Sequence, residues 1–411
     1  MTIRRGVRAG DMAIRDPVIV AGAGPVGCTV AIRLAQAGIP VVLLEANAEL
    51  PLTLRASTWH PPTLDMMNEL GLAKPLHEQG LICRYYQHRD RRTGEIAEFD
   101  MELLRGATRH PYRLQVEQWR YTQLVWQELT EKYPIAHCLF NHSVKGVHQT
   151  GDGVDVLVWV NGEEKLIHGS FAIAADGADS ALRKAVAITY EGFTWPEKFL
   201  VASTSFPLET KFERLSSVNY ISDPQEWIVL LRTPTLWRVL VPTAPGLSDE
   251  EVLSDRYIQD RLHHMAPHDG DFEITHRTLY RVHQRVARSY RRGRVLLAGD
   301  SAHINNPLGG MGMNGGIHDA WNLADKLIRI HAGAEAGHLL DLYDRQRREI
   351  CLRYVQEQTI QNKQQMEEKD PNRQAKRQAE LMAIAADPTR ARAFLMKSSM
   401  LLALQQEAEI R

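Results

Sequence analysis

The chain has little cysteine, and the few cysteines are scattered. Its 411 residues include four, at positions 28, 83, 138 and 351, and no two of them form a C-x-x-C pair. Such usage is typical of reduced thiols in a cytosol rather than of a disulfide scaffold or a zinc ribbon. We therefore predict a cytoplasmic protein.

The sequence also has no long apolar run, and its net charge is close to zero. No apolar run approaches the ~20 residues that span a bilayer, and a net charge of −1 gives no reason to expect nucleic acid or a membrane surface as a partner. The 17 histidines lack ligand spacing with supporting thiols or acids, so we predict no functional metal. A G-x-S-x-G elbow and a Walker loop are absent too. What remains is an ordinary globular composition, 44% hydrophobic and 24% charged.

The length predicts more than one folding unit. A chain of 411 residues exceeds the ~250–300 at which a single core usually stops growing. The basic residues 1–15 have no apolar core of a signal peptide, and we expect a disordered tail there.

A dinucleotide fingerprint follows this tail. The apolar run 17–21 predicts a buried strand, and it leads into Gly22-Ala23-Gly24-Pro25-Val26-Gly27, a G-x-G-x-x-G turn. A helix and a second strand at 41–44 come next, and the second strand ends at Glu45. In this context the glycines permit a tight turn and close approach of a pyrophosphate, and the acid binds a ribose. An acid there favours FAD or NAD over NADP.

The chain is organised around residues 294–327. The run 295–298 predicts a buried strand that delivers Asp300 to a glycine-rich loop, and a helix with apolar spacing begins near Ile317. Glycine allows backbone to approach a ligand, and a helix start offers unpaired N–H groups to something electron-rich. Between the two nucleotide motifs, Asp176-Gly177 with Ser180 and Arg183 predicts a turn and a capped helix.

These three motifs, in this order, resemble those of the class A FAD-dependent aromatic hydroxylases, the single-component enzymes similar to para-hydroxybenzoate hydroxylase. The resemblance implies an α/β fold: a Rossmann-like FAD-binding domain of the GR2 type, an inserted antiparallel β-sheet that forms the substrate domain, and C-terminal helices. We assign residues 16–80, 106–185 and 286–335 to the FAD domain, 81–105 and 186–285 to the substrate sheet, and 336–411 to a helical region. The polar residues of this last region suggest a solvated face or a helix-pair surface, with core or dimer packing beyond residue 390.

The motifs and the resemblance together identify cofactor contacts. The family has a glutamine at the start of a helix beside the FAD phosphates, and Gln115 is the matching position here. An exposed, helix-capping glutamine is the alternative for this residue. The expected FAD-binding residues are Gly22, Gly24, Pro25, Val26, Gly27, Glu45, Ala46, Arg55, Gln115, Asp176, Gly177, Arg183, Gly299, Asp300, Pro307, Gly310, Gly312, Met313 and Asn314.

Candidates for the reaction itself are fewer. Pro307 would shape the floor of the substrate pocket, and His60, Tyr220 and Arg232 are candidate catalytic side chains, with ordinary packing or surface roles as the alternative for each of these three. The resemblance implies that NADH or NADPH binds transiently and reduces FAD, and that O2 then forms a flavin C4a-hydroperoxide that hydroxylates a phenolic or heteroaromatic ring. A homodimer is the default assembly.

Two other functions stay open. The first is a flavin-dependent halogenase or a flavin reductase without oxygen insertion, although the stretch 236–242 matches the halogenase segment G-W-x-W-x-I-P poorly. The second is a flavin-binding regulator without catalysis.

Overall fold

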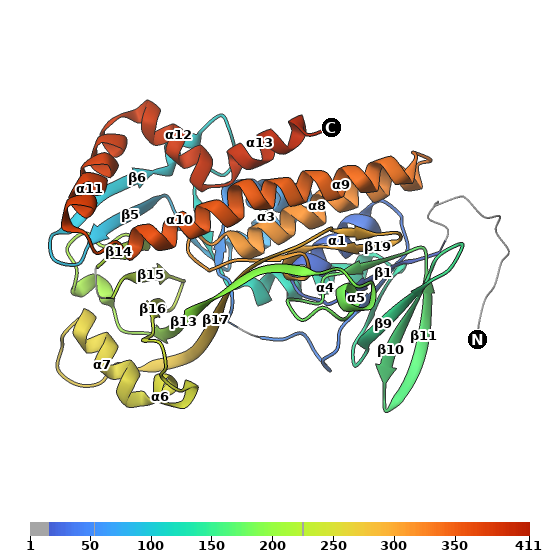
Figure 1. Cartoon of the computed structure of the whole chain (residues 1–411), viewed down its shortest axis with the longest axis horizontal. Coiled ribbons are helices and arrows are strands. Elements are labelled where there is room, and N and C mark those ends of the chain that lie inside the picture. Colours follow the sequence, from blue (N-terminus) through green and yellow to red (C-terminus); the bar gives the residue numbers. More distant parts are fainter. Residues whose placement is uncertain (1–15, 53, 224–225) are drawn as a thin grey trace.

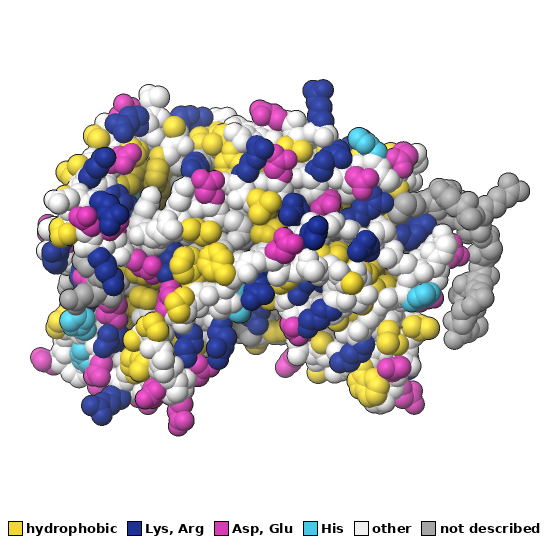
Figure 2. Space-filling model, in the orientation of Figure 1, with side chains coloured by type: hydrophobic (Ala, Val, Ile, Leu, Met, Phe, Trp, Pro, Cys, Tyr) yellow, Lys and Arg dark blue, Asp and Glu magenta, His cyan; other side chains and the backbone are white. Residues whose placement is uncertain are grey.

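The computed structural model describes residues 16–52, 54–223 and 226–411 (Figure 1). The predicted disordered tail, residues 1–15, lies outside the described residues. In the described part of the chain, no helix combines the length and the apolar character needed to cross a membrane. Acidic and basic side chains are interspersed over the face shown in Figure 2.

A six-stranded sheet forms the first layer, in the order β18-β19-β12-β1-β2-β8. All neighbours are parallel except β18 and β19. The central strands are buried on both faces, which explains their continuous apolar runs. The bounds are β1 Val18–Ala21, β2 Val41–Leu44, β8 Ala136–Leu139, β12 Phe171–Ala174, β18 Arg291–Arg292 and β19 Val295–Leu297.

Helices cover this sheet and connect its strands. The predicted strand, glycine turn and helix near the N-terminus are confirmed, and so is the strand before the second glycine-rich loop. The helix after this loop is also present, but it begins at Met311 rather than near Ile317, so Gly312 lies in its first turn and not in the loop. Ser180 caps the short helix α5, as predicted, by accepting a hydrogen bond from the Arg183 N–H at 3.0 Å. The bounds are α1 Pro25–Gln36, α4 Gln118–Lys132, α5 Ala181–Ala185 and α8 Met311–His331.

Two small sheets flank the first layer. An antiparallel meander contains β9 Ser143–Gln149, β10 Val154–Val160 and β11 Glu163–Gly169. The last residue of β11, Gly169, packs closely against the start of β1, since a Cβ there would lie 2.5 Å from the Pro17 carbonyl oxygen. The other sheet joins β3 Thr58–Trp59, β7 Arg113–Gln115 and β4 Leu81–Cys83, with α2 Pro61–Glu69 and α3 Ala73–His77 between β3 and β4.

An eight-stranded sheet forms the other large layer, in the order β20-β17-β13-β16-β15-β14-β5-β6. It is antiparallel, as expected for residues 186–285, except where β5 runs parallel to β14. The bounds are β5 Tyr85–Asp90, β6 Gly94–Asp100, β13 Tyr190–Thr204, β14 Val218–Ser222, β15 Ile228–Arg232, β16 Trp237–Pro242, β17 Ile274–Ala287 and β20 His303–Ile304.

Helices lie on both faces of this second sheet. The pair α6 Asp249–Leu253 and α7 Asp255–Met265 packs on one face, and C-terminal helices cover the other (Figure 1). Residues 336–411 are helical, as predicted, and α9 continues into α10 through a π-helical stretch, Cys351–Gln356. The bounds are α9 Ala336–Ile350, α10 Glu357–Met366, α11 Pro371–Ala386, α12 Pro388–Ser398 and α13 Leu401–Glu409. The predicted fold class is therefore confirmed, while the division into domains stays a prediction.

Candidate active site

The sequence motifs meet at one edge of the parallel sheet. The Gly22–Gly27 turn follows β1, Glu45 and Ala46 follow β2, Asp176 and Gly177 follow β12, and Gly299 and Asp300 follow β19. These strands are neighbours in the sheet, so their carboxyl ends lie side by side. Ligands of open α/β sheets bind at this edge.

The glycines of the first turn have different roles. Gly22 has φ +98°, and a Cβ there would lie 2.4 Å from the Ala175 carbonyl oxygen. A Cβ on Gly27 would lie 1.9 Å from the Gly22 carbonyl oxygen, so the fold itself requires both glycines. A Cβ on Gly24 would meet no atom of residues 16–52, 54–223 or 226–411 within 4 Å, and none of their side chains caps α1, which begins at Pro25. Gly24 therefore leaves room for a ligand phosphate at a helix start.

Glu45 is fixed beside this turn. One carboxylate oxygen accepts a hydrogen bond from the Ala23 N–H at 3.1 Å, and the other accepts from the Asn47 N–H at 3.0 Å. Ala46 is exposed next to it. The Asn47 side-chain amide also donates to the second oxygen at 2.6 Å, so the oxygen that bonds Ala23 keeps a lone pair for a ribose hydroxyl group.

Asp300 occupies the equivalent edge position after β19. Gly299 has φ +65° and packs against Val26, whose Cγ2 would lie 2.7 Å from a Cβ at that position. The Tyr190 hydroxyl donates to the Asp300 carbonyl oxygen at 2.9 Å. The Asp300 side chain reaches solvent but is surrounded by protein, and this burial raises its pKa while the charges of His303 and Arg55 oppose the shift. A carboxylate that reaches solvent at this edge can accept hydrogen bonds from the hydroxyl groups of a bound chain.

Arg183 braces the Asp300 segment instead of pointing to open space. Its guanidinium donates to the carbonyl oxygens of Ser301 at 2.9 Å and Ala178 at 2.8 Å. Asp176 accepts from the Leu182 N–H at 3.3 Å, while its second oxygen is buried and has no partner among the described residues. Gly177, with φ +81°, is open to added atoms. In this segment, Asp176 and Gly177 can touch a ligand and Arg183 holds the loop.

The second glycine-rich loop prepares a helix start. The Gly310 N–H donates to the Pro307 carbonyl oxygen at 3.0 Å, and Gly309 and Gly310 have φ of +102° and +67°. Pro307 is exposed. No side chain of the described residues caps α8, so the N–H groups of Gly312 and Met313 in its first turn are available to an electron-rich group.

Asn314 and His60 hold this loop from below. The buried Asn314 amide donates to the carbonyl oxygens of Thr58 at 2.8 Å and Gly310 at 2.7 Å, and it accepts from the His60 N–H at 2.9 Å. The His60 Nε2 lies 2.8 Å from the Gly309 carbonyl oxygen. Burial, followed by the charge of Arg113, lowers the pKa of His60 to about 3. His60 is therefore a neutral brace of the loop, and the Asn314 side chain has no free donor for a ligand.

Gln115 does not stand at a helix start, contrary to the expectation for a phosphate ligand. It lies on β7 with its side chain buried, and its amide is 3.0 Å from the Thr58 hydroxyl. Helix α4 begins three residues later at Gln118, whose side-chain oxygen accepts from the Ala56 N–H at 3.4 Å, next to Arg55. Gln118 therefore replaces Gln115 as the candidate ligand.

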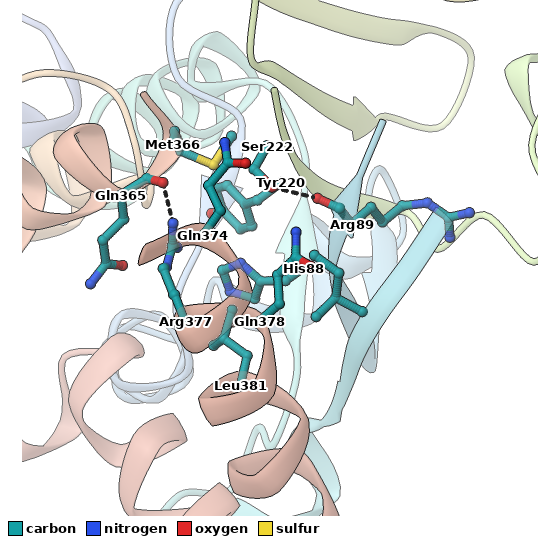
Figure 3. Close-up of a pocket in the computed structure, with 11 residues that line it drawn as sticks. His88, Arg89, Tyr220, Ser222, Gln365, Met366, Gln374, Arg377, Gln378 and Leu381 are labelled. Atoms are coloured by element: carbon teal, nitrogen blue, oxygen red, sulfur yellow. Dashed lines mark hydrogen bonds between the residues drawn. The ribbon is translucent and has the colours of Figure 1, made fainter. Parts of the chain in front are cut away.

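A pocket opens between the eight-stranded sheet and the C-terminal helices. It consists of two adjoining cavities of about 60 and 20 Å³. The larger one reaches the second glycine-rich loop at Leu308, Gly309 and Met311. The smaller one, which Figure 3 shows, lies farther along β5, β14 and α11. Because the larger cavity touches the loop, it is the candidate substrate pocket.

Tyr220 is the one predicted catalytic side chain that lines both cavities. Arg232 lines neither. Side chains alternate along β15, so Val229 and Leu231 share the pocket side of the sheet with Tyr220, whereas Arg232 lies on the other side with its guanidinium 5.6 Å from the Trp237 ring. Arg232 therefore lies outside the candidate pocket, and this geometry does not support its predicted catalytic role.

Sequence reasoning missed most of the pocket. The polar residues of α10 and α11 were expected on a solvated face or a helix-pair surface, but Gln358, Asn362, Gln365 and Arg377 line the pocket, and α12 adds Phe394. Arg113 and His88, which also line the pocket, stand inside charged stretches with no motif. Helical spacing marks a polar face but cannot distinguish solvent from a cavity.

The comparisons with known proteins agree with this geometry. The model of the family described as FAD binding domain matches residues 15–358. The chain is 34% identical over 390 residues to para-nitrophenol 4-monooxygenase of Pseudomonas sp. strain WBC-3, covering 94% of this chain and 96% of the relative. It is 29% identical to 6-hydroxy-3-succinoylpyridine 3-monooxygenase of Pseudomonas putida, covering 84% of this chain and 87% of the relative.

A solved structure is similar along nearly the whole chain. The crystal structure of p-nitrophenol 4-monooxygenase from Pseudomonas putida superposes with a TM-score of 0.89 at 31% identity, and covers 94% of this chain and 98% of that one. Family match, sequence relatives and fold point the same way. The chain therefore belongs to the FAD-dependent aromatic hydroxylases.

Proposed function

We propose that this chain is a single-component monooxygenase that uses FAD, NADH or NADPH, and O2 to hydroxylate a phenolic ring. One observation carries the proposal. The pocket between the sheet and the C-terminal helices opens onto the loop at Leu308 and Gly309, and this loop follows directly from the Asp300 edge of the nucleotide site. A ring in this pocket would lie beside the reactive end of a bound dinucleotide.

The edge residues fit FAD. Gly24 leaves space at the start of α1 for the pyrophosphate, Glu45 has lone pairs for the adenosine ribose, and Asp300 is accessible for the ribityl chain. The uncapped start of α8 would accept the electron-rich end of the flavin. When bound, FAD supplies the redox chemistry that activates oxygen.

The protein's own part is binding and positioning. Tyr220 and Arg113 present a hydroxyl group and a charge to the ring, while Leu308 and Met311 exclude water from the loop side. His60 holds Gly309 in place and stays neutral, because its pKa is lowered to about 3. We therefore assign His60 no role as a general acid or base at neutral pH.

For the substrate, we propose a phenol with a substituent in the para position. Support comes from the relative that is named para-nitrophenol 4-monooxygenase and covers nearly the whole chain. Use of NADH or NADPH, a homodimer, a cytoplasmic location and a role in aromatic catabolism remain predictions. A halogenase or a reductase without oxygen insertion is the alternative function.

The test uses the purified holoenzyme with its flavin absorbance recorded. We expect NADH or NADPH to bleach the flavin faster when 4-nitrophenol is present, with oxygen uptake and a hydroxylated product. Bleaching without product would favour the reductase. A halide-dependent product would favour the halogenase, and a protein that cannot be loaded with FAD would overturn the proposal.

A further inference from the structure

Arg113 is a buried cation that lacks an anionic partner in the candidate pocket. Its side chain is 2% exposed, and no carboxylate pairs with it among the described residues. Of the five N–H donors of a guanidinium, neighbouring side chains take one: Nη1 donates to the Tyr220 hydroxyl at 3.2 Å. The Nε–H group is buried and has no partner in the described part of the chain. An unpaired buried charge is costly, so an anion in this place would be bound strongly.

The guanidinium is held in a fixed orientation. It stacks on the Tyr86 ring, with its central carbon 4.4 Å from the ring centroid, and the Tyr220 contact fixes its edge. It extends from β7, where Arg113 lies opposite Cys83 of β4. A rigid planar fork of this kind matches the two lone-pair directions of an oxyanion.

The pocket around Arg113 has a positive charge that nothing in its lining balances. No Asp or Glu occurs among the described lining residues of either cavity, and Arg377 is the second cation that reaches the larger one. Arg89 lines the smaller cavity, but Figure 3 shows its side chain extending away from it, and its guanidinium donates to the Glu213 carbonyl oxygen.

The two cations occupy different ends. Arg113 lines only the cavity that touches Leu308 and Gly309, whereas Arg377 lines both cavities and bonds the Gln365 carbonyl oxygen (Figure 3). Arg113 therefore belongs to the end of the pocket nearest the glycine-rich loop, where the reacting ring is expected.

We infer that Arg113 is the specificity-determining residue of the pocket and binds an oxyanion carried by the aromatic substrate. This inference rests on the proposed function and deepens it. The pocket selects rings that carry an ionised oxygen, either a phenolate or a carboxylate, over neutral rings of the same shape. Tyr220 is a positioning residue for this contact, because its hydroxyl group accepts from Arg113.

The titratable groups that face Arg113 are few. They are Tyr86 and His88 of β5, Tyr220 of β14, Cys83 of β4, His60 before α2 and Arg377 of α11. The pKa of His60 and of His88 is lowered to about 3 by burial and nearby arginines, and the pKa of Tyr86 is raised to about 12 by burial. Both histidines are thus neutral from about pH 6 to 9, and ligand binding in that range reports chiefly on ionisation of the ligand.

The test measures dissociation constants on the holoenzyme through the change in flavin absorbance. The probes are 4-nitrophenol, 4-nitrobenzoate and 4-nitroanisole, a methyl ether that cannot ionise. The variants are Arg113→Met, which removes the charge, and Arg113→Lys, which keeps the charge but loses the fork. Arg84→Met is the matched control, because Arg84 is exposed and paired with Asp100.

We expect Arg113→Met to weaken the binding of 4-nitrophenolate by about 10- to 100-fold and the binding of 4-nitroanisole by less than about threefold. The affinity of Arg113→Lys for 4-nitrophenolate should lie between those of the wild type and Arg113→Met. In both Arg113 variants KM should rise more than kcat falls. The affinities of Arg84→Met should match those of the wild type. An equal loss for 4-nitrobenzoate would identify a general oxyanion site, and a loss confined to 4-nitrophenol would identify a phenolate site.

Two results would overturn the inference: an unchanged affinity for 4-nitrophenolate in Arg113→Met, or equal losses for the anion and the ether. If Arg113→Met loses FAD, the test is the pH dependence of binding to the wild type. The affinity of the wild type for 4-nitrophenol should rise with pH as the phenol ionises, and a fall in affinity would refute the inference. Normal binding with no product from any phenol would refute the proposed function and leave the anion site standing.

Discussion

The Arg347 Nε and the Asp319 Oδ1 lie 2.7 Å apart, and both side chains are buried. The second Asp319 oxygen accepts from the Gly299 N–H at 3.0 Å and lies 2.8 Å from the His303 Nε2. Arg347 also pairs with Glu407 of α13. Burial would raise the pKa of Asp319, but the charges of His303 and Arg347 outweigh it and lower the pKa. The last helix is thus connected through buried charges to the turn that presents Asp300.

Replacing Asp319 by Asn should destabilise the fold and loosen the Asp300 turn. Removing one partner from a buried ionic network costs about 3–5 kcal/mol, and we expect FAD to bind about tenfold more weakly. Chemical denaturation of the apoprotein measures the first effect, and a titration with FAD measures the second.

The matched control is Asp325→Asn on the same helix. Asp325 pairs with Arg33 but is 45% exposed, so the loss should be about 0–1 kcal/mol with unchanged FAD affinity. Equal losses in the two variants would show that the buried network has no special role.

Gly24 and Gly27 should respond to alanine in opposite ways. Gly24→Ala meets no protein atom within 4 Å and keeps an ordinary φ of −72°, so folding should be unaffected while FAD binding falls at least about tenfold. Gly27→Ala places a Cβ 1.9 Å from a carbonyl oxygen and should destabilise the fold by about 1–3 kcal/mol. Thermal unfolding without FAD separates the two. Tight FAD binding by Gly24→Ala would mean that the pyrophosphate does not pass this glycine.

Glu45→Gln should weaken FAD binding while the fold persists. The amide keeps the shape of the side chain but loses the charge that strengthens hydrogen bonds to ribose hydroxyl groups. Its NH2 group also cannot accept from the Ala23 or Asn47 N–H, so we expect a loss of about 10- to 100-fold. Glu49→Gln, an exposed change in the same loop, is the control. Fluorescence of free and bound FAD reports the affinity, and an unchanged value would remove Glu45 from the site.

His60 should make the protein sensitive to acid. Its pKa is lowered to about 3 in the folded state, against ~6.5 when unfolded. The unfolded chain therefore binds more protons between these values, and the contribution is complete above about pH 6.5 and lost as the pH falls towards 3. As the pH falls from 6.5 to 5, His60 should lower the free energy of unfolding by about 2 kcal/mol.

The measurement is the slope of the free energy of unfolding against pH. His60→Leu should reduce this slope by about one proton, whatever the overall stability of the variant. Buried carboxylates and His88 act in both proteins, so they cancel in the difference. Parallel curves for the wild type and His60→Leu would contradict the prediction.

The order of residues was enough to predict the nucleotide half of the protein. Apolar strands with glycine turns at fixed spacing allow one local geometry, so Gly22, Glu45 and Asp300 could be assigned to the edge of a parallel sheet from the order of residues alone. Local chemistry suffices there, because each motif carries its own strand, turn and helix start.

The substrate half depends on how elements that are distant in the sequence pack together. Arg113, Tyr220 and Arg377 come from a short strand, a sheet and a C-terminal helix, and they meet because these elements pack around one cavity. Alternation along a strand predicts which side chains share a side of the sheet, but it does not predict which side faces the cavity. The sequence therefore could not distinguish Arg232 from an arginine that lines the cavity. Polar helical spacing likewise could not separate solvent from a pocket, since both accept the same side chains.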